Sequence, residues 1–291
     1  MKNTRERAIM SRYDFRKTSV KLVYGLMVIC IALISLSMLY PFVNTFLGSL
    51  KTTKEFFTFP TPFFPSNWLW ENYKESLTLF NITKYFKNTL FIFFGNTVFS
   101  LTFIGLAAYS LSHLRVPMKK WITLYFLSTL LIPAASYLIP NYLNLKGFGL
   151  LNTYWAFWLP AGANAFFLLL LKNFFDGIHK ELFESARIDG ASELRCFLGI
   201  AIPLSAPILV TLVLLGFSTT WNDFYWSYLV MKEDKLPLAA AIYSKIIYPG
   251  STINWNIRFA ILTMTLIPPV VLFLFFQRFI IGGLSVGAVK G

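Results

Sequence analysis

Charged side chains are scarce in this sequence: Asp, Glu, Lys and Arg make up 13% of its 291 residues. Soluble domains contain about twice that share, roughly 25%. Hydrophobic residues make up 56% of the chain, and the mean hydropathy is +0.60. The shortage of charge excludes an ordinary soluble domain and predicts a protein that crosses a membrane several times.

Cysteine and histidine are also rare, with two residues of each. Neither Cys30 nor Cys196 is expected in a compartment that favours disulfides, so we assign both a packing role. We expect His113 and His179 to be solvated in loops, and two histidines are too few for a zinc site. The chain also lacks the G-x-x-x-x-G-K-[ST] loop that binds ATP. No cofactor is therefore expected on this chain.

Long charge-free runs mark six predicted membrane spans, each with about the 20 apolar residues needed to cross a hydrocarbon core roughly 30 Å thick. The first run is too long for the core of a signal peptide and is expected to be a retained helix. The predicted spans are residues 22–40, 88–112, 121–140, 151–171, 205–225 and 259–278. The predicted fold is an all-α polytopic membrane protein. A basic arm, residues 1–21, precedes a single transmembrane domain, residues 22–291.

The net charge of +13 is concentrated in segments between spans. Seven basic residues precede the first span, and Arg115, Lys119 and Lys120 follow the second. Lys and Arg are enriched in cytoplasmic loops, so both termini are predicted to be cytoplasmic. Residues 172–204 would then be cytoplasmic, while residues 41–87 and 226–258 would lie outside. The basic residues serve topology and lipid headgroups, and no nucleic-acid partner is expected.

Seven of the eight tryptophans fall near the predicted outer face. Trp rings favour the headgroup level, which supports the predicted orientation. Aromatic faces also stack on sugars, so Trp158, Trp221 and Trp226 could line a carbohydrate path. Both interpretations stay open.

Ionisable residues are nearly absent from the spans, with Asp223 and Arg258 at or near outer ends. Carriers coupled to protons or sodium usually place acids or broken helices near the midplane. If this protein moves a solute, the energy is expected to come from another subunit. Pro203 and Pro207 near the fifth span, and the Pro268–Pro269 pair in the sixth, are expected to kink those helices.

The segment "GLSVG", residues 283–287, matches the G-x-S-x-G pattern of hydrolases. That pattern needs a strand before it and a helix after it. Here it follows a predicted membrane helix, so a hydrolase site is rejected. Its small residues would instead let the tail thread a narrow groove.

Residues 172–204 hold five acids among four basic residues, which departs from the basic character of the other inner segments. Leu194, Phe197, Leu198 and Ala201 follow helical spacing. Residues 181–188 suit a first short helix, and Gly190 supplies a bend that a Cβ would resist. Two short helices with small side chains form a compact knob that another protein could approach closely. Glu184, Arg187 and Asp189 could pair with that partner or hold the bend.

This knob resembles the cytoplasmic loop of permease subunits in ATP-binding-cassette (ABC) importers, whose pattern is E-A-A-x3-G-x9-I-x-L-P. The sequence has Glu184-Ser185-Ala186, then Gly190, then Ile200-Ala201-Ile202-Pro203, with every spacing matched. The resemblance implies the type I importer permease fold and a coupling helix that docks on an ATPase subunit. The implied docking residues are Glu184, Ser185, Ala186, Arg187, Asp189 and Gly190.

Further stretches resemble the maltose-type carbohydrate permeases: "LAAYSLSHLRVP", "GLLNTYWAFWLP", "WNDFYW" and "GGLSVGAVKG". In that branch the C-terminal tail also reaches the ATPases, which implicates Gly287, Ala288, Val289, Lys290 and Gly291. The outer loop between spans five and six meets a substrate-binding protein. Our candidates there are Lys235, Tyr243, Tyr248 and Asn256.

The resemblance implies one permease of a carbohydrate importer in a bacterial or archaeal cytoplasmic membrane. Its implied partners are a second homologous permease, two ATPases that hold ATP and Mg²⁺, and an external binding protein. An oligosaccharide is the preferred cargo because the outer face is aromatic. Two alternatives stay open: an intramembrane enzyme that uses Glu184 or Asp189 as acid or base, and an ion-coupled carrier.

Overall fold

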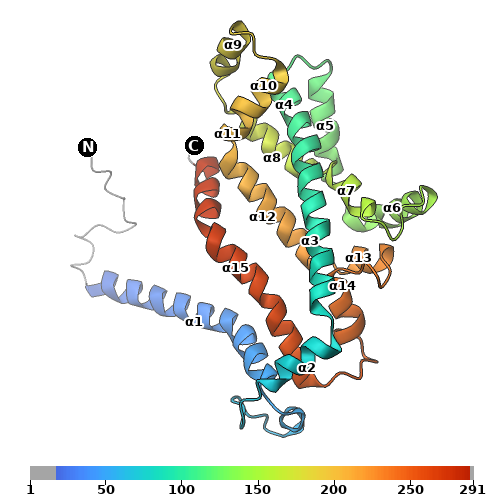
Figure 1. The fold of residues 1–291 in the computed structure, drawn as a ribbon. Helices are drawn as coiled ribbons and strands as arrows, with labels where there is room; N and C mark the ends of the chain where they lie inside the picture. The colour runs from blue at the N-terminus through green and yellow to red at the C-terminus, as the bar shows by residue number, and fades with distance from the viewer. Residues whose placement is uncertain (1–17, 289–291) are drawn as a thin grey trace. The chain divides into compact units, whose positions relative to one another are not determined.

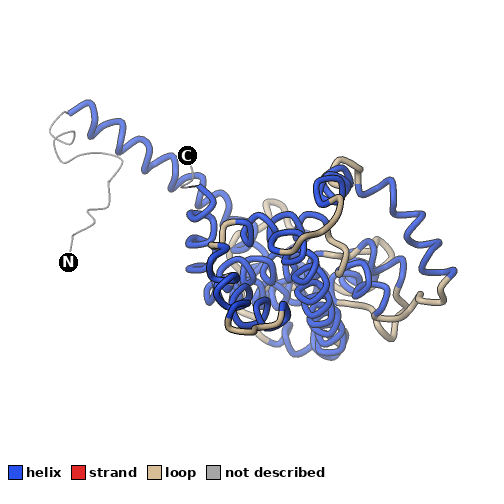
Figure 2. The backbone as a smooth tube through the Cα atoms, turned by 90° about the horizontal axis from the view of Figure 1, so that it is seen from above, coloured by secondary structure: helices blue, strands red, loops and turns tan. Residues whose placement is uncertain are grey.

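The computed structural model describes residues 18–288, and these form helices joined by loops, with no strand in that range (Figure 2). For residues 278–288 only the backbone is described. The all-helical class predicted from the sequence is confirmed. The α-helices are α1 (Thr18–Ser49), α2 (Glu71–Leu79), α3 (Ile82–Phe99), α4 (Gly105–His113), α5 (Lys119–Thr129), α6 (Ala134–Gly147), α7 (Trp155–Ala161), α8 (Ala165–Asp176), α9 (Lys180–Ile188), α10 (Glu193–Cys196), α11 (Ile202–Leu204), α12 (Ala206–Asn222), α13 (Tyr225–Val230), α14 (Leu238–Ile242) and α15 (Trp255–Ala288).

Three π-helical stretches and one 3₁₀ turn add to these α-helices. Three five-residue π-helical stretches, Ser100–Ile104, Phe197–Ala201 and Tyr243–Ile247, continue α3, α10 and α14 without a break. A 3₁₀ turn covers Thr53–Phe57. As a result α3, the first π stretch and α4 form one long helix (Figure 1).

Four helices are long and apolar enough to cross a membrane: Thr18–Ser49, Ile82–His113, Trp155–Asp176 and Trp255–Gln277. They cover the first, second, fourth and sixth predicted spans. The sixth stays helical through Pro268 and Pro269. Two bent helix pairs, α5 with α6 and α10–α11 with α12, bring the number of candidate spans in the described part to six.

The third predicted span, residues 121–140, differs from a continuous helix. α5 and α6 meet at 101° across the turn that ends at Pro133. Proline lacks an N–H and disfavours helical geometry at the residue before it, Ile132, so α5 cannot run on into α6. With 11 residues, α5 is about 16 Å long, roughly half the thickness of a hydrocarbon core.

The fifth predicted span, residues 205–225, corresponds to α12. The preceding helical segment ends at Leu204, one residue after Pro203, and α12 leaves it at 79°. Ser205 occupies the bend, with Pro207 in the first turn of α12. The expected kink near Pro203 and Pro207 is thus a sharp bend between two helices.

The chain divides into two compact units. Within the described range, the first comprises residues 18–76 and Asn254–Met264, and the second comprises Leu77–Ile253 and residues 265–288. The single domain predicted from residue 22 onward stays a prediction.

In the first unit, a buried polar network holds the segment after α1. Asn72 Nδ2 donates to the carbonyl oxygens of Ser49 (2.8 Å) and Lys51 (3.0 Å). Asn256 Nδ2 donates to Asn72 Oδ1 (2.9 Å), and Thr53 Oγ1 donates to Asn256 Oδ1 (2.9 Å). Buried amides are stable only when they are hydrogen-bonded, so this network fixes the segment on the start of α15.

The core of the second unit lies around the π stretch and α4, against α8, α9, α10 and α12. Its fully buried members include Ala108, Leu171, Phe175, Phe183 and Cys196. The expected packing role of Cys196 is thereby met, whereas Cys30 is exposed on α1.

Candidate functional site

The α9–α10 knob lies at one end of the second unit, beside the end of α4 (Figure 1). α9 ends at Ile188, and Gly190 follows with φ +82°, a left-handed conformation that residues with a Cβ rarely adopt. The Ala191 N–H donates to the Ala186 carbonyl (2.9 Å). Ser192 then caps α10 by accepting from the Arg195 N–H (3.3 Å). The predicted pair of helices joined at a glycine is confirmed.

Side-chain bonds fix the knob to α4. Arg187 Nε donates to Glu193 Oε1 (2.7 Å), across the bend. Tyr109 Oη donates to Glu193 Oε2 (2.8 Å), from α4. The hydrogen bond to Glu193 raises the pKa of Arg187. Arg187, one of the predicted docking residues, therefore holds the bend from within the chain.

An aromatic base supports the knob. Phe183 of α9 is fully buried against Tyr109 and His113, with ring centroids 5.9 Å and 4.1 Å away. His113 is thus half-buried against a ring, which corrects the expectation of a solvated loop histidine. Ser112 Oγ donates to Asp176 Oδ1 (2.6 Å), which ties α4 to α8. These contacts join α9 and α10 to α4, and α4 to α8.

The outward face of the knob combines polar and apolar groups. Glu184, Ser185, Asp189 and Gly190 are exposed, and Ala186 is half-buried. Ile188 is 86% exposed, which adds an apolar group to this face. Ile188 was not predicted from the sequence, where its only signal is an isoleucine between charged Arg187 and Asp189.

The loop between α13 and α14 lies at the opposite end of the α3–α4 helix (Figure 1). Tyr85 Oη donates to Glu233 Oε1 (2.6 Å), and Lys245 Nζ lies 2.9 Å from the same oxygen. Burial opposes ionisation of Glu233, but these hydrogen bonds outweigh it and lower its pKa. The loop is therefore held against the start of α3.

The predicted binding-protein contacts divide into exposed and internal residues. Tyr243 and Tyr248 are 43% and 59% exposed. Lys235 is half-buried and donates to the Asn152 carbonyl (2.9 Å), so it supports the loop from inside. Asn256 is buried in the network of the first unit, which differs from the expected surface position.

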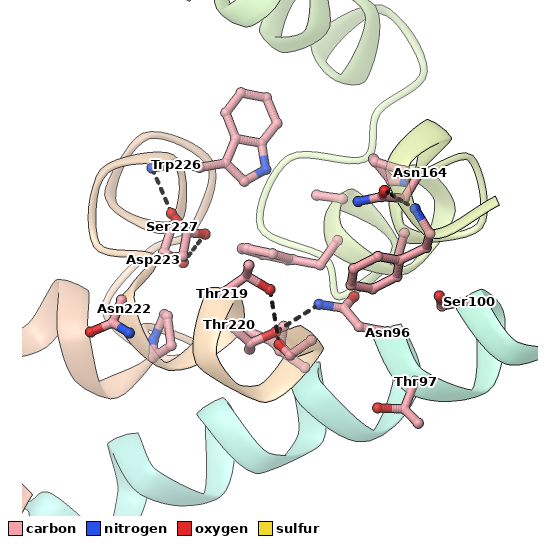
Figure 3. A pocket seen from close by; sticks show the side chains of 18 of the residues that line it. Asn96, Thr97, Ser100, Asn164, Thr219, Thr220, Asn222, Asp223, Trp226 and Ser227 are labelled. Atoms are coloured by element: carbon pink, nitrogen blue, oxygen red, sulfur yellow. Dashed lines mark hydrogen bonds between the residues drawn. The ribbon is translucent and has the colours of Figure 1, made fainter. Parts of the chain in front are cut away.

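A cavity of about 660 Å³ lies within the second unit, beside α3, α7 and α12 (Figure 3). Trp226, one of the predicted path residues, lines it. The rest of its polar lining was missed by the sequence analysis, because the residues come from distant segments and no local motif links them. The polar lining residues are Asn96, Thr97, Ser100, Asn164, Thr219, Thr220, Asn222, Asp223, Trp226 and Ser227.

A second cavity of about 720 Å³ lies on another side of α12, between α14 and the later turns of α15. Trp221 and Tyr243 line it, among mostly aliphatic and aromatic side chains. Trp158 lines neither of the two cavities. It packs on Gly95 and Phe91, between α3 and α7, so the structure gives it a packing role.

The structure describes only two of the five residues predicted to form the tail contact. The backbone at Gly287 and Ala288 belongs to α15, and Val289, Lys290 and Gly291 lie outside the described residues. The "GLSVG" segment is helical rather than a strand-to-helix turn. Among residues 18–288, no three His, Cys, Asp or Glu side chains are grouped as metal ligands.

Comparisons with known proteins agree over most of the chain. Residues 89–286 match the family model described as "Binding-protein-dependent transport system inner membrane component". The arabinooligosaccharides transport system permease protein AraQ of Halalkalibacterium halodurans is 31% identical over 279 residues, covering 95% of this chain and 99% of that protein. The sn-glycerol-3-phosphate transport system permease protein UgpE of Yersinia pestis is 31% identical over 258 residues, covering 86% and 91%.

A solved structure shares the fold. It is described as a bacterial ABC transporter involved in the import of the acidic polysaccharide alginate. The TM-score is 0.82 with 23% identity, covering 93% of this chain and 99% of that one. The helix arrangement is therefore that of a known transporter subunit.

Proposed function

Since the chain belongs to the family of inner-membrane components of binding-protein-dependent transport systems, we propose that it is one permease half of an ABC importer for an oligosaccharide. The family consists of transport components, so the alternative of an intramembrane enzyme is set aside. In this proposal the chain supplies the wall of the pathway and transmits motion to it, and no covalent chemistry occurs on it.

One observation supports the transmission role above all others. The α9–α10 knob projects exposed Glu184, Asp189 and Ile188, while Glu193 joins it to α4 through Arg187 and Tyr109. A force applied to the outer face of such a knob reaches the membrane helices without being absorbed by a flexible loop. This is what coupling to an ATPase requires.

The proposed mechanism is alternating access. ATP and Mg²⁺ bind to two ATPase subunits, whose closure draws the knob of this chain and that of a second, homologous permease together. The helices then turn the pathway outward, where an external binding protein releases its sugar. The segment between α12 and α15, which includes exposed Tyr243 and Tyr248, is the proposed contact with the binding protein.

The proposed cargo and location follow from the relatives and the chain's charge pattern. A relative with 99% of its length matched is named for arabinooligosaccharides, which favours a short oligosaccharide here. The bacterial relatives favour a bacterial or archaeal cytoplasmic membrane, and the basic N-terminal residues favour cytoplasmic termini.

Two substitutions in the knob test the docking. Glu184→Lys reverses an exposed charge, and Gly190→Pro cannot adopt φ +82° because proline is fixed near −65°. Both are expected to reduce ATP-dependent sugar uptake by at least tenfold and to weaken co-purification of the ATPase, while the chain still inserts into the membrane.

A matched control is Glu71→Lys, which reverses an exposed charge on α2. It should leave uptake and ATPase co-purification close to those of the parent. If both knob variants keep normal uptake and retain the ATPase, the docking proposal is wrong.

A further inference from the structure

The cavity beside Asn96 has a distinct hydrogen-bonding character. Several lining side chains already donate within the protein, which leaves their oxygen lone pairs available. The donations are Asn96 Nδ2 to Thr220 Oγ1 (3.2 Å), Thr97 Oγ1 to Phe93 O (2.9 Å), Thr219 Oγ1 to Gly216 O (2.9 Å), Asn222 Nδ2 to Ser218 O (2.8 Å) and Ser227 Oγ to Asp223 Oδ2 (3.0 Å). The lining therefore presents these acceptor oxygens beside donor groups on Tyr137, Asn164 and Trp226.

Asn96 is the most informative member of this lining. Its amide points from α3 toward Thr220 of α12 (Figure 3). Its Oδ1 is buried and has no hydrogen-bond partner among the described residues. Buried acceptors are nearly always satisfied in folded proteins, so Asn96 Oδ1 is an acceptor at this cavity that lacks its usual partner.

The charge of the lining points the same way. All residues that line this cavity belong to the described range 92–237, and none of them is Lys or Arg. Asp223 is the one carboxylate among them, and its oxygens accept from Ser227 Oγ and the Trp226 N–H. Carboxylate and phosphate groups are acceptors and are usually bound by Arg or Lys, which this lining lacks.

Apolar surface completes the site. Trp226, Tyr137 and Phe157 also line the cavity. Sugar rings present hydroxyl groups, which donate and accept, along their edges and C–H groups on their faces, and this suits uncharged polar side chains interspersed with aromatic rings. Sequence identity alone does not select the cargo, because relatives of equal identity are named for a neutral oligosaccharide and for a phosphate ester.

We infer that this cavity, built around Asn96 and Thr219, is a subsite for an uncharged sugar, and that it disfavours sugar acids and sugar phosphates. The inference rests on the proposed import function and adds the ligand class and the residues that recognise it.

A charge-probe experiment tests the site without knowledge of the natural cargo. Thr219 is exposed to the cavity, so Thr219→Cys places a thiol there. The background is Cys30→Ser, which removes the exposed native thiol, while Cys196 is fully buried and stays. The complete importer in native membranes is treated with a cationic or an anionic methanethiosulfonate reagent.

The measured quantity is the rate of modification by the cationic reagent divided by the rate for the anionic reagent. The control is Asn144→Cys, which is exposed on α6 outside the cavity. The ratio for Thr219→Cys is expected to be at least threefold higher than the ratio for this control. Arabinotriose and maltotriose should slow the modification, whereas an alginate trisaccharide and sn-glycerol 3-phosphate should not. A preference for the anionic reagent, protection by an acidic probe, or failure of both neutral probes to protect would each overturn the inference.

Uptake assays separate this inference from the proposed function. Thr219→Val removes a hydroxyl from the cavity but no bond between helices, and Thr123→Val removes a similar hydroxyl from α5, outside the cavity. Thr219→Val should raise the sugar concentration for half-maximal uptake roughly threefold to tenfold, as expected for one lost hydrogen bond, and Thr123→Val should not. ATP-dependent uptake that is unaffected by Thr219→Val contradicts the subsite alone, whereas the absence of any ATP-dependent uptake contradicts the proposed function.

Discussion

The carboxylate of Glu193 accepts more side-chain hydrogen bonds than any other acid of the α9–α10 knob. It accepts from Arg187 at both oxygens, 2.7 and 3.2 Å, and from Tyr109 at 2.8 Å. Three donors from two helices leave it one orientation. At the scale of single residues, an acid that the family pattern does not include joins α9 and α10 to α4.

A second well-bound acid, Glu55, belongs to the first unit and predicts a pH dependence. Glu55 Oε2 accepts from the Thr52 N–H (2.6 Å), and Oε1 accepts from the Ser66 N–H (2.7 Å). Burial opposes ionisation, but the hydrogen bonds from Ser66 and Thr52 outweigh it and lower the pKa from 4.5 to about 2.

Because the folded-state pKa lies below the unfolded value, the ionised carboxylate stabilises the fold above a pH of about 4.5. That contribution is lost as the pH falls toward about 2. Glu55→Gln should lower the free energy of unfolding at neutral pH by about 1 kcal/mol, typical of a lost helix cap. It should also reduce the fall of the melting temperature as the pH becomes acidic. Thermal melting of the purified protein from neutral to acidic pH measures this. Glu71→Gln, exposed on α2, is the control, and an equal effect of the two changes would contradict the assignment.

At the scale of elements, α3 and α7 approach closely at one glycine. A Cβ on Gly95 would lie 1.9 Å from Trp158 Nε1, so the indole fills the space that any side chain would need. Trp158 thereby packs the seven-residue helix α7 against α3.

Gly95→Ala should therefore destabilise the protein by about 1–3 kcal/mol, the usual cost of overpacking, although alanine is the better helix former. Gly25→Ala on α1 meets nothing within 4 Å and is the matched control. The melting temperatures of both variants in detergent provide the comparison. A Gly95→Ala protein as stable as the parent would show that the α3–α7 contact is looser than described.

Sequence patterns predicted the elements well where the signal is local. Hydrophobic run length located four continuous spans, and spacing around Gly190 predicted the two helices of the knob. The bend before α6 was missed because the apolar run continues through Pro133. The polar cavity was missed because Asn96, Asn164 and Thr219 are far apart in the chain and meet only in the fold.

At the scale of the whole molecule, the α9–α10 knob and the α13–α14 loop contact opposite ends of one helix. Glu193 of the knob bonds Tyr109, and Glu233 of the α13–α14 loop bonds Tyr85. Those tyrosines are 24 positions apart in the helix Ile82–His113, a rise of roughly 36 Å, which exceeds the hydrocarbon core of about 30 Å. A membrane crossed by that helix must therefore separate the knob from the α13–α14 loop.

Site-directed labelling tests the predicted sides. With Cys30 replaced by serine, Lys232→Cys should react with a membrane-impermeant maleimide in intact cells, and Glu181→Cys should react only in inverted vesicles; both positions are exposed. Labelling of both positions from one side would contradict the separation, and the reverse pattern would contradict cytoplasmic termini.

The π stretch Ser100–Ile104 gives this long helix one residue more than a regular α-helix of the same length would contain. Each residue of an α-helix turns the chain by about 100°, so an insertion elsewhere would swing one half of the helix away from its partners. The wide turn absorbs that residue locally, and Asn96 before it and Tyr109 after it keep independent alignments with the cavity and with the knob. One continuous helix therefore serves both the cavity and the knob, with the wide turn between Asn96 and Tyr109.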